Sequence, residues 1–253
     1  MSEELVVRKC ETLADLKRCC KLQQAIWKED DLDVEPVTIM VVAARTGGQV
    51  LGAFYGGELV GFTEALVGLK DGQPYLHSHV TGVAEGYRDR GIGRSLKLFQ
   101  RTEALSRGVR LIQWTFDPLE TRNAHFNLNC LGAISRQFIP NLYGITSSPL
   151  HRGLPTDRLL AEWHLDSQRV KKLAEAGPSM AANGQSNGAT IHVPAELEEW
   201  KRNDLQRVIQ TQERIRHEFS SWFARGYAAV GVHVSPEGWA YQLSNGDWSR
   251  QGY

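Results

Sequence analysis

The chain has 253 residues, of which 42% are hydrophobic and 23% charged, a composition typical of a soluble globular protein. Lysine plus arginine and aspartate plus glutamate both number 29, so the net charge is zero, and a nucleic-acid binder with a basic surplus is disfavoured. No window has the roughly 18 apolar residues that span a bilayer, and the first ten residues lack the pattern of a signal peptide, so we expect a cytoplasmic protein without a membrane partner.

The predicted elements begin with a short strand, LVVRKC, and an amphipathic helix that starts after Thr12 as its N-cap. A second helix opens at Pro36 and stops at Gly47. Three strand-like runs follow, the first two joined by a turn at Gly56-Gly57 and the third reading PYLHSHVTGV. A helix from Ile92 to Gly108, the strand VRLIQWTFD, the short helix RNAHFNLNCLG and the strands AISRQFIPNLYG and DRLLAEWHL complete the series.

Residues 1–166 therefore read β-α-α-β-β-β-α-β-α-β-β and form the first predicted domain. The run AGPSMAANGQSNGAT is small, polar and rich in turn residues, and it indicates that 167–190 form a linker or exposed loop. Residues 191–253 predict a strand, a long helix from about Ala195 to Gly226, and a hairpin. Because about 60 residues make a thin core alone, we expect this extension to pack on the first domain or on a second subunit of a homodimer.

The segment RDRGIGRS joins a strand to a helix, where unpaired backbone N–H groups and the helix dipole favour an anionic phosphate. Arg88, Arg90 and Arg94 add charge-assisted contacts. A Walker A motif is absent, and a Rossmann G-x-G-x-x-G fails because Leu96 stands at the third glycine and a hairpin precedes the loop. A plain helix N-terminus with exposed arginines is the remaining alternative.

The spacing Arg88-x-x-Gly91-x-Gly93 matches the [QR]-x-x-G-x-[GA] signature of the GCN5-related N-acetyltransferases, the GNAT superfamily, and residues 1–166 resemble its whole domain in element order. The resemblance implies an α/β (α+β) GNAT fold: a mixed, mostly antiparallel central sheet flanked by helices, here with a small C-terminal β-α-β-β extension. HSHVTGV, NLYG, LPTDRLLAEW and FARGY also resemble a branch of the superfamily that carries such an extension.

The resemblance implies acetyl-CoA or another acyl-CoA as co-substrate and no metal. The CoA pyrophosphate would be held by the backbone amides of Arg88, Asp89, Arg90, Gly91, Ile92, Gly93, Arg94 and Ser95. The pantetheine arm would pair with the end of the preceding strand, at Gly82, Val83 and Ala84, and would be faced by Asn123.

Acyl transfer to an amine requires a proton acceptor for the amine and a proton for the departing thiolate. In much of the superfamily a tyrosine, four residues before the helix-ending glycine, donates that proton, but this chain has Leu128 there. Tyr143 in NLYG is the substitute candidate, and the alternative is a half-buried aromatic side chain at a strand end.

Strand alternation predicts that Tyr75, His77, His79 and Thr81 share one face. His79 is the first candidate for the general base and His77 the second, because imidazole accepts a proton near neutral pH. The alternatives are a structural histidine pair and a metal site, the latter disfavoured because no third ligand presents itself. Glu64 on the preceding strand is a further candidate as base or amine anchor, and the alternative is a solvated strand residue.

The four cysteines form no C-x-x-C pair, and we interpret them as reduced thiols. In the loop from Thr146 to Arg158, Arg152 and Arg158 could bind a carboxylate of an amino-acid substrate or of a succinyl group; the alternative is that both are surface arginines.

These features together predict a CoA-dependent N-acyltransferase that moves an acetyl or succinyl group directly to the amine of a small molecule, within a ternary complex. One alternative is a non-catalytic acyl-CoA-binding or interaction module with a degenerate GNAT site, which Leu128 favours. The other is a nicotinamide oxidoreductase.

Overall fold

The structure, a computed structural model, describes residues 4–27, 34–144, 153–176 and 188–246. It contains two compact units, Met1–Gln113 and Trp114–Tyr253, whose boundary falls within strand β5 (Leu111–Phe116). This division differs from the predicted one at residue 166, because residues 114–166 pack with the C-terminal extension. Of the predicted linker, Gln168–Ala176 form a helix, α5, and residues 177–187 lie outside the described part of the chain.

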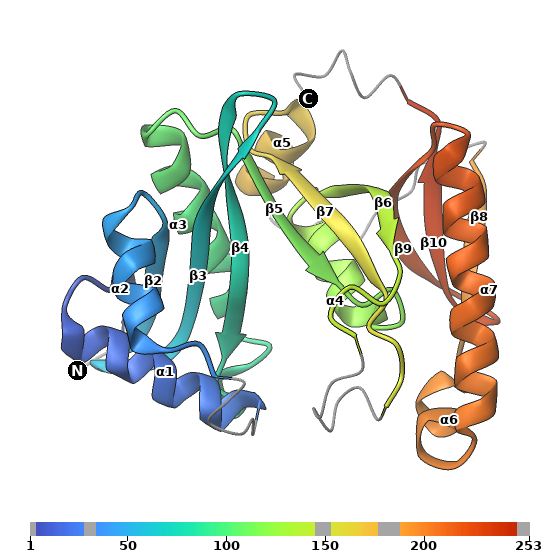
Figure 1. Ribbon diagram of the computed structural model, residues 1–253, viewed down its shortest axis with the longest axis horizontal. Helices are drawn as coiled ribbons and strands as arrows, with labels where there is room; N and C mark the ends of the chain where they lie inside the picture. Colours follow the sequence, from blue (N-terminus) through green and yellow to red (C-terminus); the bar gives the residue numbers. More distant parts are fainter. Residues whose placement is uncertain (1–3, 28–33, 145–152, 177–187, 247–253) are drawn as a thin grey trace. The chain divides into compact units, whose positions relative to one another are not determined.

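The first unit is a sheet with helices on both faces (Figure 1). Its strands lie in the order β1-β2-β3-β4-β5, antiparallel except for the parallel pair β4–β5. Before β5 its elements are β1 (Leu5–Lys9), α1 (Leu13–Trp27), α2 (Val37–Arg45), β2 (Gln49–Tyr55), β3 (Glu58–Lys70), β4 (Gln73–Val83), the 3₁₀ turn η1 (Glu85–Tyr87) and α3 (Ile92–Ser106).

Strand β2 shows how the apolar pattern covers both faces of this sheet. Val50 and Phe54 pack in one cluster with residues of α1 and α2, whereas Leu51 and Ala53 pack in a second cluster with Leu96 of α3. Successive side chains of a strand point to opposite faces, so an unbroken apolar run indicates burial on both sides. Helices α1 and α2 therefore cover one face and α3 the other.

The second unit contains a sheet in the order β7-β6-β9-β10-β8. Neighbouring strands in this order pair antiparallel. Helix α7 packs beside β8 and β6 (Figure 1). In chain order its elements are α4 (Thr121–His125), the π-helical turn η2 (Phe126–Cys130), β6 (Ile134–Ile139), β7 (Arg158–His164), α5, β8 (Thr190–Pro194), α6 (Leu197–Asn203), α7 (Leu205–Ala224), β9 (Ala228–Ser235) and β10 (Gly238–Ser244).

The long helix predicted from Ala195 to Gly226 is two helices, α6 and α7, which meet at Asp204. The Asp204 carboxylate accepts a hydrogen bond from the Arg207 backbone N–H at 3.2 Å and so caps α7. Aspartate competes well for such a capping position because its side chain satisfies an otherwise unpaired N–H. The sequence pattern missed this break because the apolar spacing continues across it.

Asn129 of η2 joins the C-terminal extension to the rest of the second unit. Its side-chain amide donates to the Val232 carbonyl at 3.1 Å and accepts from the Val232 N–H at 2.9 Å, so it pairs with β9 as a strand would. The buried Tyr241 hydroxyl adds a 2.7 Å hydrogen bond to the Pro118 carbonyl. The extension therefore packs on residues 114–166 of its own chain. Among the described helices, none combines the length and apolar character needed to cross a membrane.

Candidate active site

The glycine-rich loop lies between β4 and α3, as the sequence predicts. Gly91 is the N-cap of α3 and adopts φ 78°, a left-handed conformation that favours glycine. The first helical hydrogen bond runs from the Ser95 N–H to the Gly91 carbonyl at 3.0 Å, so the amides of Ile92, Gly93 and Arg94 precede it. A Cβ placed on Gly91 would meet no atom within 4 Å. The loop therefore presents amides and a helix dipole to open space, which fits a phosphate.

Strand β4 leaves part of one edge open just before this loop. Its antiparallel ladder with β3 runs from Gln73 to Val83, whereas its parallel ladder with β5 has only the pairs Leu76↔Ile112 and His77↔Gln113. Among the described residues, 78–83 therefore have a partner strand on the β3 side alone. An extended molecule with amide groups can add to such an edge as another strand does.

A β-bulge at His79 changes the predicted face of this strand. Ser78 pairs with Ala65 and Val80 with Glu64, so His79 is the extra residue. A bulge re-aims the side chains beyond it. The Thr81 hydroxyl lies 2.7 Å from the Thr63 hydroxyl, which also approaches the Ser78 hydroxyl, so Thr81 shares a face with Ser78. The prediction that alternation continues unbroken from His77 through Thr81 is therefore wrong.

His79 faces a carboxylate that the sequence analysis did not single out. Its Nε2 lies 3.2 Å from Glu35 Oε2, and the two side chains are 38% and 18% exposed. Glu35, just before α2, is positioned by its backbone N–H, which donates to Gln23 Oε1 at 3.3 Å. A carboxylate beside an imidazole stabilises the protonated form that a general base acquires. No local pattern could reveal this pair, because its members lie on different elements.

Glu64 of β3 is buried, and in the described part of the chain neither of its carboxylate oxygens has a hydrogen-bond partner. Burial, with a smaller contribution from the charge of Glu35, raises the pKa of Glu64 to about 7. Buried polar groups normally find partners, so a buried carboxyl without one in the described structure is a candidate for a functional role. His77 is half-buried, and burial, followed by His79 and Lys97, lowers its pKa.

The other candidate residues lie in the second unit. Leu128 is fully buried and carries no proton to donate. The Tyr143 hydroxyl lies 2.9 Å from the Thr115 hydroxyl, and the Arg158 guanidinium lies 5.4 Å from the centre of the Tyr143 ring. The structure thus brings together the predicted acid and one predicted carboxylate binder.

Arg158 is anchored as well as buried. It is 9% exposed, and its Nη1 lies 3.9 Å from Asp117 Oδ2, a contact that the sequence analysis missed. Burial is the main reason that the pKa of Asp117 rises to about 6. Asn123 lies in α4 and accepts a 3.3 Å hydrogen bond from the Asn127 amide. Arg152, the other predicted carboxylate binder, falls outside the described residues.

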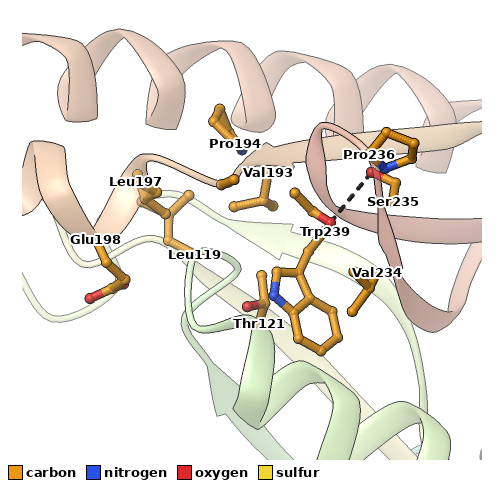
Figure 2. A pocket seen from close by; sticks show the side chains of 12 residues that line it. Leu119, Thr121, Val193, Pro194, Leu197, Glu198, Val234, Ser235, Pro236 and Trp239 are labelled. Carbon is orange, nitrogen blue, oxygen red and sulfur yellow. Dashed lines mark hydrogen bonds between the residues drawn. The ribbon is translucent and has the colours of Figure 1, made fainter.

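A pocket of about 300 Å³ lies elsewhere in the second unit, between the β9–β10 turn and α6 (Figure 2). Trp239 and Val193 form part of its apolar wall, and the carboxylate of Glu198 lies at one side. None of the predicted site residues lines it. Within the described ranges, no group of three or more His, Cys, Asp or Glu residues could hold a metal ion.

Comparison with known proteins identifies the class. Residues 11–132 match the model of the acetyltransferase (GNAT) family. No curated protein matches the chain. The chain therefore carries a GNAT acetyltransferase domain, as its loop motif and element order predict, and it is an acyltransferase of the EC 2.3.1 type that uses acyl-CoA.

Solved structures share this fold at low sequence identity. The ribosomal-protein-S18-alanine N-acetyltransferase of Escherichia coli has a TM-score of 0.51 at 15% identity, with 72% of this chain and 98% of that chain covered. An N-acetyltransferase of Staphylococcus aureus Mu50 has 0.51 at 14% identity, covering 64% and 99%. Arabidopsis thaliana Naa50, solved with the bisubstrate analogue CoA-Ac-MVNAL, has 0.50 at 16% identity, covering 64% and 98%.

Proposed function

We propose that this protein is an N-acyltransferase that moves an acetyl group from CoA to the amine of a small molecule such as an amino acid, with succinyl as the alternative acyl group. The observation that carries this proposal is the continuity of the open edge of β4 with the loop that begins α3. The edge suits the amide-bearing pantetheine arm and the loop suits the pyrophosphate.

In this proposal the backbone amides of 88–95 hold the pyrophosphate, and Gly82, Val83 and Ala84 supply the strand edge. Ala84 is itself fixed by a 2.8 Å hydrogen bond from its N–H to the Val60 carbonyl. The bound acyl-CoA supplies an activated thioester. Side chains of this chain must accept the amine proton and supply a proton to the thiolate.

His79 is the proposed general base. Its partial exposure lets it reach a substrate, and its contact with Glu35 stabilises the imidazolium that forms when it takes the amine proton. Glu64 is the proposed anchor of the incoming ammonium group, because its buried oxygens have unused acceptor capacity in the described structure. The substrate ammonium group would form an ion pair with Glu64 and donate hydrogen bonds to its carboxylate oxygens.

The proposed carboxylate binder is Arg158. Arginine suits carboxylate recognition because its planar guanidinium can donate two parallel hydrogen bonds. Contact with Asp117 and with the Tyr143 ring fixes its orientation before a substrate arrives. A carboxylate-bearing amine, or a succinyl group, fits such a residue better than a polyamine does.

The test uses the purified full chain. Calorimetry should show binding of CoA and acetyl-CoA but not of NADH, and a thiol-release assay with acetyl- and succinyl-CoA should show turnover with amino acids above that with polyamines. Tight CoA binding without turnover over the whole panel would favour the non-catalytic module. Absence of CoA binding would overturn the proposal.

A further inference from the structure

Four side chains form a largely buried polar chain inside the first unit. Lys97 of α3 donates from Nζ to Ser78 Oγ of β4 at 2.7 Å. Ser78 Oγ lies 3.4 Å from Thr63 Oγ1 of β3, and Thr63 Oγ1 lies 2.7 Å from Thr81 Oγ1, again on β4. Each hydroxyl can accept one hydrogen bond and donate another. The chain therefore connects an ammonium group to a hydroxyl further along the same strand.

The two ends of this chain differ in their surroundings. Lys97 is 3% exposed and also donates to Gln100 Oε1 at 3.0 Å. Thr81 is partly exposed and lies in the part of β4 whose edge opposite β3 has no partner strand among the described residues. The bulge at His79 is what brings Ser78 and Thr81 to the same side of the strand. Lys97 is thus buried in the core, whereas Thr81 lies at the edge of β4 where the cofactor is proposed to bind.

This arrangement addresses a gap in the acyl-transfer chemistry. When the carbon–sulfur bond of the thioester breaks, the departing thiolate needs a proton, and Leu128 occupies the position of the usual donor. We propose that Lys97 supplies this proton through the hydroxyls of Ser78, Thr63 and Thr81. The inference rests on the proposed function, since it requires that the thioester lies along the open edge of β4.

The proton balance closes without an added reactant. The amine nitrogen forms a bond to the acyl carbon, and its proton goes to His79. The carbon–sulfur bond breaks with its electron pair on sulfur, which takes the hydroxyl proton of Thr81. Thr81 is reprotonated by Thr63, Thr63 by Ser78 and Ser78 by Lys97. Neutral Lys97 and protonated His79 then exchange one proton with solvent, which restores both groups.

The acidity of Lys97 suits this role. Burial lowers its pKa to about 7, below the roughly 8.5 of an ordinary thiol, so transfer to a thiolate is downhill. His77 of β4 is a titratable group that interacts electrostatically with Lys97. Glu103 lies further along α3, where its carboxylate pairs with Lys9 of β1 and with Arg107. The Thr63 hydroxyl also lies 3.0 Å from the Val80 carbonyl, so it must turn toward Thr81 to transmit the proton.

The first test measures protonation rather than turnover. In protein labelled with ¹³C at the lysine side chains, the Lys97 resonance, assigned from its loss in Lys97→Met, should titrate near neutrality. Saturating CoA should raise its midpoint, because a thiolate at the end of the relay favours the ammonium form. By linkage, the thiol of bound CoA, followed by its thiolate absorbance, should titrate lower in the wild type than in Lys97→Met.

Thr81→Val removes the last hydroxyl and preserves side-chain shape, and Thr81→Ser is the matched control that keeps the hydroxyl. Thr81→Val should bind CoA yet lose the shift of the Lys97 midpoint, whereas Thr81→Ser should retain it. With an acceptor amine from the thiol-release panel, kcat should fall about 10²-fold in Thr81→Val and stay within a few-fold in Thr81→Ser. In the wild type, kcat should decline above neutral pH as Lys97 loses its proton. This decline should disappear in Lys97→Met.

A purely structural role for Lys97 predicts a different result. CoA would bind to the wild type and to Thr81→Val, and the Lys97 midpoint would be the same with and without CoA in both. That outcome overturns the relay and leaves the proposed function standing. If CoA fails to bind the wild type at all, the proposed function fails and the relay fails with it.

Discussion

His79 and Glu35 meet across the first unit, with 3.2 Å between the imidazole Nε2 and the carboxylate Oε2. The β-bulge that makes His79 the extra residue of β4 places it without a partner on β3. Bulges are over-represented beside active sites, where they re-aim a side chain, and a carboxylate also orients the histidine of the Ser-His-Asp triad.

The first prediction concerns this pair. His79→Ala should lower kcat by about 10²-fold or more in the thiol-release assay, because the amine proton loses its acceptor. Glu35→Gln should cause a smaller loss, since the imidazole remains. His217→Ala, in helix α7 of the second unit, serves as the control for loss of a histidine. A His79→Ala rate within a few-fold of the wild type would assign the base elsewhere.

The second prediction concerns stability and pH at Glu64. Its pKa is about 7 in the folded chain and near 4.5 in the unfolded chain. Below pH 4.5 the Glu64 carboxyl is protonated in both states, so it contributes no pH-dependent loss of stability. As pH rises from 4.5 to 7 the unfolded chain releases its proton first, and stability falls by up to about 3 kcal/mol. Urea denaturation of Glu64→Gln should show a shallower decline over this range.

Glu58→Gln, at the exposed start of the same strand, is the matched control for that experiment. It should keep the pH dependence of the wild type. Equal slopes for Glu64→Gln and Glu58→Gln would contradict the raised pKa of Glu64.

The third prediction tests the phosphate loop. Gly91→Glu should abolish CoA binding in calorimetry, because the added carboxylate would repel the pyrophosphate and hinder its approach to the loop amides. A Cβ at Gly91 meets no atom within 4 Å, so the fold should tolerate the added side chain. Gly72→Glu is the matched control: Gly72 has φ +75, close to the +78 of Gly91, and its Cβ would also meet nothing within 4 Å. Both variants therefore carry similar backbone strain and the same added charge. Equal CoA affinity for the two would argue against the loop as the binding site.

The fourth prediction concerns Arg158. Arg158→Gln should raise KM for carboxylate-bearing acceptor amines about 10- to 100-fold, the effect of losing a charge-assisted hydrogen bond of about 1.5–3 kcal/mol. The methyl esters of the same acceptors should be affected much less, which controls for a general disturbance around Asp117 and Tyr143. If acid and ester acceptors lose activity equally, Arg158 does not recognise a carboxylate.

The fifth prediction concerns the C-terminal extension. Asn129→Ala leaves the buried N–H and carbonyl of Val232 without their partner, so urea denaturation should show a loss of about 2–4 kcal/mol. Asn203→Ala, in α6, removes an exposed amide with only a 3.4 Å contact to Glu199 and should change stability little. Similar stability of the two variants would show that Asn129 does not hold the extension in place.

Much of the fold could be predicted from the sequence because the relevant signals are local. Pro36 and Gly47 bracket α2, Gly56-Gly57 turns β2 into β3, and the spacing around Gly91 places the loop before α3. Where local signals conflicted, the prediction was wrong. The apolar spacing continues from α6 into α7, but the capping carboxylate of Asp204 divides the predicted single helix in two.

By itself the sequence determined the GNAT acetyltransferase domain and its acyl-transfer chemistry, and it predicted the loop residues that suit a phosphate, since motif spacing and element order are properties of short segments. Only the tertiary structure decided how the acid–base groups are arranged. It paired His79 with Glu35 and buried the Glu64 carboxylate with no hydrogen-bond partner among the described residues. It also linked Lys97 to Thr81 through the hydroxyls of Ser78 and Thr63. Those relationships depend on a bulge and on packing between elements distant in sequence, and no periodicity within one segment specifies them.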